Sequence, residues 1–168
     1  MRIAAGGKTV LHFATHAIVH DEDPFSSFLA LGPAANGNAG DGLLTAQEIY
    51  GLNLDADLVV LSACRSAGGR VTGDGIATFA RAFIYAGAPS LVASLWDVAD
   101  EPTNRLLPDF YRAWFGGASK ARALRTAQLR LLSDLRANKV TINTPAGLVS
   151  LPELPVFWAG FALLGEPD

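Results

Sequence analysis

Cysteine is nearly absent from this chain. Cys64 is the only one among 168 residues, so no disulfide can form within the chain and no cysteine cluster can hold a metal ion. A single cysteine fits a reducing compartment. Charged residues make up only 17% of the chain, and the formal net charge is −3. Binding to a phosphate backbone needs concentrated positive charge, so we expect no nucleic-acid partner.

Long hydrophobic runs are also missing. The longest nearly uncharged stretch, residues 86–96, contains Gly87 and Pro89 and is much shorter than the ~20 residues of a membrane helix. The first residues do not have the pattern of a signal peptide. We therefore expect a cytoplasmic protein without a membrane partner. Half of the residues are hydrophobic, which predicts a folded chain, and the length suits one domain over residues 1–168.

Segments with strand patterns alternate with segments with helix patterns. Alternating or continuous apolar residues predict strands over 8–15, 57–63, 90–96 and 157–165. Helical spacing and capping signals, including Thr45 with Glu48, predict helices over 46–51, 74–86, 102–115 and 119–137. Residues 20–42 are predicted to be mostly loop. This alternation predicts an α/β fold with a mostly parallel central sheet.

Reactive side chains follow three of the predicted strands. His16 comes after the first strand, Cys64 after the second, and Trp96 with Asp97 after the third. The working residues of a parallel sheet gather at the carboxyl ends of its strands. A thiol nucleophile needs a base, and the ordinary pKa of histidine, about 6.5, suits that task. His16 precedes Cys64 by 48 positions (64 − 16), the order and approximate gap of caspases. A free cysteine at a strand end is also compatible with a structural role.

Two other sites can be considered and rejected. His12, His16 and His20 lie four residues apart, as zinc ligands on a helix would, but this segment has a strand pattern. On a strand, neighbouring histidines would be roughly 13 Å apart, too far to share one ion. The glycine-rich residues 68–75 lack the ending of a phosphate-binding loop. We therefore expect no metal and no cofactor.

Five motifs in order along the chain carry a family resemblance. They read "HFATHA", "DGLLTAQEI", "ADLVVLSAC", "ASLWDVAD" and "FWAGFALLG". Together they resemble the CHAT domain, a caspase-like family of the caspase and separase clan that usually follows tetratricopeptide repeats in bacterial proteins. The resemblance implies a caspase-like three-layer sandwich, here without the family's N-terminal strands, so the chain would be the C-terminal portion of the full domain. It also implies a tetratricopeptide-repeat region or partner.

The resemblance assigns catalytic roles to a few positions. His16 would be the general base and Cys64 the nucleophile, and the backbone N–H groups of Ala17 and Cys64 would form the oxyanion hole. Arg65 departs from the family pattern, in which an acidic or amide residue often follows the cysteine. A cation there would either lower the thiol pKa or alter the substrate pocket; as an ordinary surface residue it would only face solvent.

The same resemblance assigns substrate contacts. The segment from Ser94 through Trp96 would pair with an extended peptide. Asp97 and Asp100 would form the wall of a pocket for a basic residue, although aspartates in loops are usually only solvated. The sequence thus predicts a cysteine endopeptidase that cleaves a protein or peptide substrate. The alternative is a catalytically silent CHAT-like interaction or signalling module, and the reactivity of the thiol would separate the two.

Overall fold

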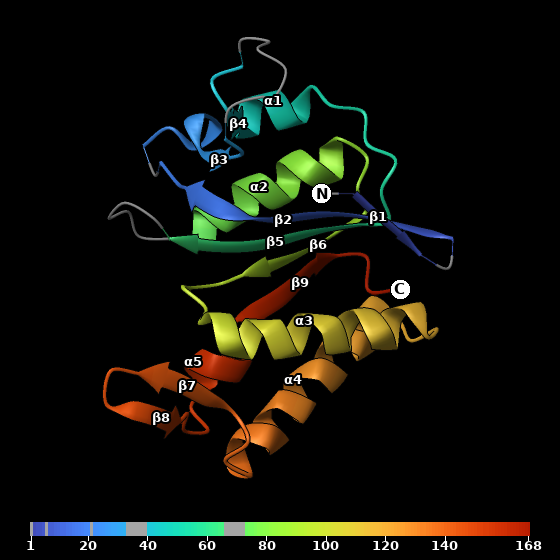
Figure 1. Cartoon of the computed structure of the whole chain (residues 1–168). Coiled ribbons are helices and arrows are strands. Elements are labelled where there is room, and N and C mark those ends of the chain that lie inside the picture. Colours follow the sequence, from blue (N-terminus) through green and yellow to red (C-terminus); the bar gives the residue numbers. More distant parts are fainter. Residues whose placement is uncertain (1, 6, 21, 33–39, 66–72) are drawn as a thin grey trace. The chain divides into compact units, whose positions relative to one another are not determined.

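The computed structural model describes residues 2–5, 7–20, 22–32, 40–65 and 73–168 (Figure 1). The chain divides into two compact units. The first comprises Met1–Asp97 with Leu164–Glu166, and the second comprises Val98–Leu163 with Pro167–Asp168. All the predicted site residues except Asp100 lie in the first unit.

The central sheet has seven strands, and most of them belong to the first unit. The strands of this sheet are β1 (Arg2–Ala5), β2 (Lys8–Ile18), β3 (Phe28–Ala30), β4 (Leu43–Thr45), β5 (Leu58–Arg65), β6 (Ser90–Ser94) and, near the end of the chain, β9 (Phe161–Gly165). Between the strands lie the 3-10 turn η1 (Pro24–Ser26) and the helices α1 (Ala46–Tyr50) and α2 (Gly73–Tyr85). The strand order is β4-β3-β2-β5-β6-β9, and β1 also pairs with β2. The pairs β2–β5 and β5–β6 are parallel, whereas β1–β2, β2–β3 and β3–β4 are antiparallel.

Helix α2 packs on one face of this sheet (Figure 1). Val59 and Leu61 of β5 belong to the same buried cluster as Phe79 and Phe83 of α2, because alternate strand residues point to the same face. Phe83 is fully buried, and its ring lies 5.6 Å from that of Phe13 on β2. Burial of this apolar area is the main force that holds the helix on the strands.

The second unit is built on a pair of helices. It contains α3 (Asp100–Phe115), α4 (Lys120–Arg136), the hairpin of β7 (Thr141–Thr144) and β8 (Gly147–Ser150), and α5 (Pro155–Trp158). Leu106 and Phe110 of α3, with Leu124 and Leu131 of α4, are among its buried side chains. Ser119 caps α4 by accepting a hydrogen bond from the backbone N–H of Arg122, at the start of the helix predicted over 119–137.

The structure confirms the predicted α/β class, with helices that flank a central sheet whose middle strands are parallel. It also confirms the Thr45–Glu48 capping box. The prediction of one strand over 157–165 was wrong, because Pro155 starts the short helix α5 and the strand begins only at Phe161. The N-terminal strand β1, the short strands β3 and β4, and the β7–β8 hairpin were not predicted.

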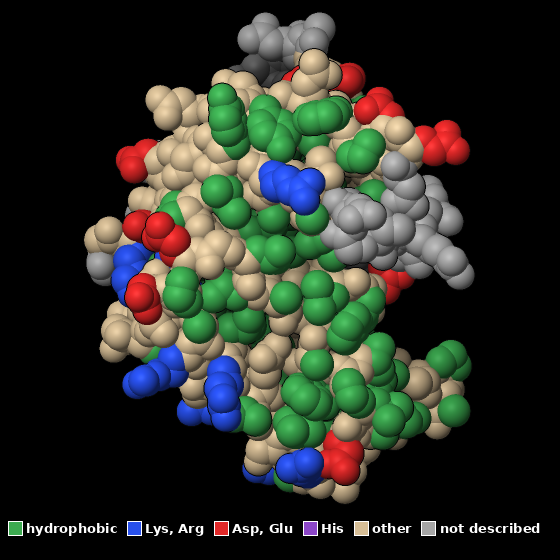
Figure 2. Space-filling model, turned by 180° about the vertical axis from the view of Figure 1, so that it is seen from behind, with side chains coloured by type: hydrophobic (Ala, Val, Ile, Leu, Met, Phe, Trp, Pro, Cys, Tyr) green, Lys and Arg blue, Asp and Glu red, His purple; other side chains and the backbone are tan. Residues whose placement is uncertain are grey.

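Some hydrophobic side chains remain at the surface, as on the face shown in Figure 2. In the first unit the rings of Phe25, Tyr50 and Tyr85 contact one another in series, with centroids 5.8 and 5.5 Å apart. Leu148 and Val149 are exposed on the hairpin of the second unit. Within the described part of the chain, no helix combines the length and the hydrophobicity needed to cross a membrane.

Candidate active site

The sheet brings the backbone positions of His16 and Cys64 together. β2 and β5 are parallel neighbours, and the register pairs His16 with Cys64 near the carboxyl end of both strands. Neighbouring strands lie about 4.8 Å apart. The His16 side chain is exposed. His16 and Cys64 are 48 residues apart along the chain but are direct neighbours across two adjacent strands.

The next register pair joins two further predicted site positions. Ala17 is the partner of Arg65, one residue beyond the His16–Cys64 pair. On its other side Ala17 pairs with Leu29 of β3. The backbones of four predicted site residues are therefore adjacent in the sheet. They are His16, Ala17, Cys64 and Arg65.

Strand β6 supplies the predicted substrate segment. Its register with β5 runs to Leu61–Ala93, and the strand ends at Ser94. Ser94 is buried, Trp96 is half-buried and Asp97 is exposed. β6 runs parallel to β5, so the carboxyl ends of the two strands lie at the same edge of the sheet, where the working residues of a parallel sheet are expected.

Asp100 belongs to the second unit, where it is the first residue of α3. Its side chain is exposed. A carboxylate in the first turn of a helix stabilises the positive end of the helix dipole, which gives Asp100 a structural role independent of any substrate.

The other two histidines, His12 and His20, lie in different environments. His12 lies on β2, half-buried, and burial lowers the pKa of its imidazole because the charged form loses water. His20 is exposed, and its Nδ1 lies 2.8 Å from the Ser26 hydroxyl. That hydroxyl donates its own proton to the Asp23 carbonyl at 2.8 Å, so the His20 ring donates to Ser26. The segment that carries His12 and His16 is the strand β2, as the sequence pattern predicts, and it ends at Ile18, before His20.

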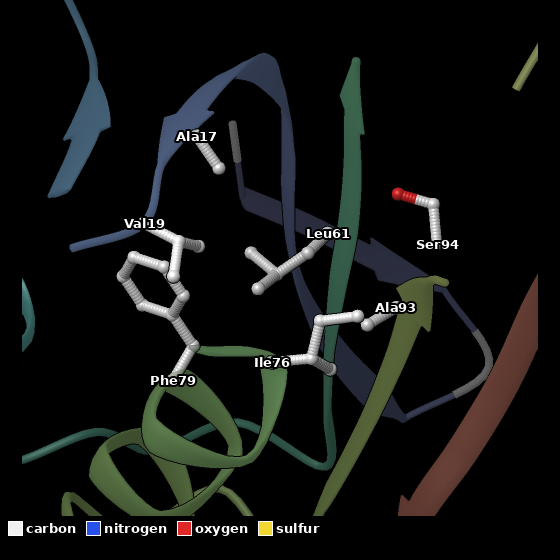
Figure 3. Close-up of a pocket in the computed structure, with 7 residues that line it drawn as sticks. All are labelled: Ala17, Val19, Leu61, Ile76, Phe79, Ala93 and Ser94. Carbon is white, nitrogen blue, oxygen red and sulfur yellow. The ribbon is translucent and has the colours of Figure 1, made fainter. Parts of the chain in front are cut away.

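An apolar pocket opens beside these strand ends within the first unit (Figure 3). The seven residues that line it are Ala17, Val19, Leu61, Ile76, Phe79, Ala93 and Ser94. They come from β2 and the residue just after it, β5, the first turns of α2, and the last two residues of β6. Ile76 and Phe79 lie within the helix predicted over 74–86, but no sequence signal shows that a space remains beside them.

Metal-type clusters are not found in the part of the chain that the structure describes: no three or more His, Cys, Asp or Glu residues there are grouped so as to hold an ion. A second concavity is lined by His12, Ala14, Thr15 and Leu31. Of these, His12 alone has a titratable side chain.

Comparisons with known proteins agree with this architecture. The family model of the CHAT domain matches residues 2–166. Tetratricopeptide repeat protein 28 of Mus musculus is 32% identical over 124 residues, and that of Homo sapiens is 31% identical over 124 residues. Each alignment covers 74% of this chain and 4% of the relative, so the chain spans about 4% of the length of these curated relatives. Their name fits the predicted association with tetratricopeptide repeats. With a match over nearly its whole length, the chain belongs to the CHAT domain family.

Proposed function

We propose that this domain is a caspase-like cysteine endopeptidase in which His16 and Cys64 form the catalytic dyad. The observation that supports the proposal best is the register of β2 and β5, which makes the two residues lateral neighbours. A nucleophile and its base must lie within hydrogen-bond reach, and adjacent positions on parallel strands meet the backbone part of that requirement.

The proposed reaction proceeds through a thioester. His16 takes the proton from the Cys64 thiol, and the thiolate attacks the carbonyl carbon of the scissile peptide bond. The backbone N–H groups of Ala17 and Cys64 stabilise the oxyanion that forms. His16 then protonates the leaving nitrogen as the C–N bond breaks. Water, deprotonated by His16, hydrolyses the thioester, and the proton returns to the sulfur.

The substrate of this proposal is an extended peptide of a protein partner. The end of β6 and the following residues, from Ser94 through Trp96, pair with it in the manner of an added strand. The supporting observation is that β6 is parallel to β5 and leaves the sheet at the same edge. A tetratricopeptide-repeat region, suggested by the names of the relatives, would present or regulate that partner.

Selective labelling of the thiol tests the proposal. Because Cys64 is the only cysteine, a peptidyl chloromethyl ketone adds one mass increment at one known position. A thiolate paired with a histidine should react at least about tenfold faster than the thiol of the denatured chain. His16→Ala should remove that advantage. Equal labelling rates for the folded and the denatured chain would instead identify a silent module.

A preference for basic residues is the second expected property. Asp97 is exposed after β6, and Asp100 is exposed in the first turn of α3. Asp97→Asn and Asp100→Asn should each lower kcat/KM for peptides with Arg or Lys before the cut, by about two- to fivefold, because an exposed ion pair contributes little. Asp41→Asn, an exposed aspartate of the first unit, is the matched control. A peptide library cleaved without preference for Arg or Lys would remove this assignment.

A further inference from the structure

The β7–β8 hairpin of the second unit has an open strand edge. Among the described residues its sheet consists of these two strands alone, joined by a turn at residues 145–146. Every residue of β8 is exposed, whereas β7 is mostly half-buried. The outer edge of β8, Gly147–Ser150, is therefore accessible to another strand.

The register of the hairpin shows which backbone groups point outward. The Leu151 N–H donates to the Val140 carbonyl at 2.9 Å, so these opposite residues form a hydrogen-bonded pair. Hydrogen-bonded and non-hydrogen-bonded pairs alternate along an antiparallel ladder, so Ser150 and Leu148 belong to pairs of the second kind. The N–H and C=O groups of Val149 therefore point toward β7, and those of Leu148 and Ser150 point away from it.

This edge lacks the features that usually protect an exposed strand, which are charged residues, proline or a covering segment. Residues 140–151 contain no charged residue, and their one proline, Pro145, lies in the turn. Leu148 is 75% exposed and Val149 is 47% exposed, and as neighbours on a strand they point to opposite faces. Hydrophobic side chains gather over this hairpin at the lower right of Figure 2. Both faces of β8 and its backbone edge are thus suited to pairing.

The absence of charge favours a second copy of this chain as the partner. A twofold axis places a strand against itself, so a charge near the axis would face a like charge, which destabilises the pairing. β8 contains no such charge. A different protein would be selected by complementary charges, and the hairpin offers none. A two-stranded hairpin is also marginal by itself, whereas two hairpins joined at β8 form a larger sheet.

We propose that the chain forms a twofold dimer in which β8 pairs antiparallel with β8 of a second copy. The outward backbone groups define the register: Leu148 of each copy exchanges N–H···O=C hydrogen bonds with Ser150 of the other. Val149 then lies on the axis, opposite its own counterpart, in a non-hydrogen-bonded pair where side chains approach most closely. This dimer involves residues of the second unit alone and does not depend on peptidase activity.

Sedimentation of the full chain tests the dimer. The interface is small, so the protein is measured from about 5 to 500 µM. A reducing agent keeps Cys64 from forming a disulfide between copies. We expect the mass to rise with concentration from 17.6 kDa towards twice that value. A constant mass of one chain over the whole range would overturn the proposal and leave the edge to a strand of another protein.

Proline substitution tests the backbone edge. Ser150→Pro removes an N–H that points away from β7, so the hairpin retains its own hydrogen bonds while the dimer loses some of its own. We expect the dissociation constant to rise at least about tenfold. Asn143→Pro is the matched control, because this exposed residue is paired with Leu148 and its N–H points outward from the opposite edge. An unchanged dissociation constant in folded Ser150→Pro, or an equal rise in both variants, would overturn the proposal.

A charge exchange tests the register and serves where Ser150→Pro fails to fold. Val149→Lys and Val149→Glu each place like charges opposite one another, so each variant alone should be monomeric at about 500 µM. An equal mixture of the two should associate, because lysine then faces glutamate. Dimerisation of either variant at the wild-type concentration, or failure of the mixture to associate, would overturn the proposed arrangement.

Discussion

Replacement of Cys64 by alanine is expected to lower kcat/KM for peptide cleavage by about 10⁴-fold or more, because the substituted protein has no nucleophile to form the thioester. His16→Ala should have an effect of similar size. The register of β2 and β5 is the reason for expecting the two to act as one unit. The double variant should then be no less active than either single variant, since the two losses are not additive for residues of one catalytic dyad.

His20→Ala is the control for this experiment. His20 is an exposed histidine that lies beyond the end of β2 and contacts Ser26, outside the register with β5. It should retain activity within about twofold of the wild type. Thermal unfolding of each variant establishes that the domain remains folded. Undiminished cleavage by a folded Cys64→Ala variant would rule out the dyad.

The parts of the fold that the sequence predicts are those with long, regular patterns. The apolar run of β5 and the helical spacing of α2 each produced an element within two residues of its observed bounds. Thr45 and Glu48 correctly predict the start of α1 because their side chains cap the helix directly. In these segments the local pattern and the tertiary packing favour the same structure.

Other parts depend on pairing with distant residues. Strands β3 and β4 have three residues each, too few to show a period, and they form because β3 pairs with β2 and β4 with β3. The register of His16 with Cys64 likewise depends on how two distant strands align. The order of the motifs along the chain indicates that the strands are neighbours, but it does not give their register. The pocket beside Ala17 arises from the sizes of side chains on four elements at once.

Truncation of Phe83 to alanine is expected to destabilise the first unit by about 3–5 kcal/mol. Phe83 is fully buried and packs against Phe13, so the substitution removes apolar contacts on both the helix and the sheet and leaves a cavity between them. Unfolding in urea, followed by circular dichroism, measures the loss as a lower midpoint.

Arg81→Ala on the same helix is the matched control. Arg81 is exposed, and alanine is a good helix former, so its free energy of unfolding should change by less than about 0.5 kcal/mol. An equal loss in the two variants would mean that burial of Phe83 against β2 and β5 is not what holds α2 in place. A large loss for Phe83→Ala alone would establish that the helix and the strands of the candidate active site form one cooperative core. Substitutions in α2 would then reduce activity through the position of His16 and Cys64 as well as through stability.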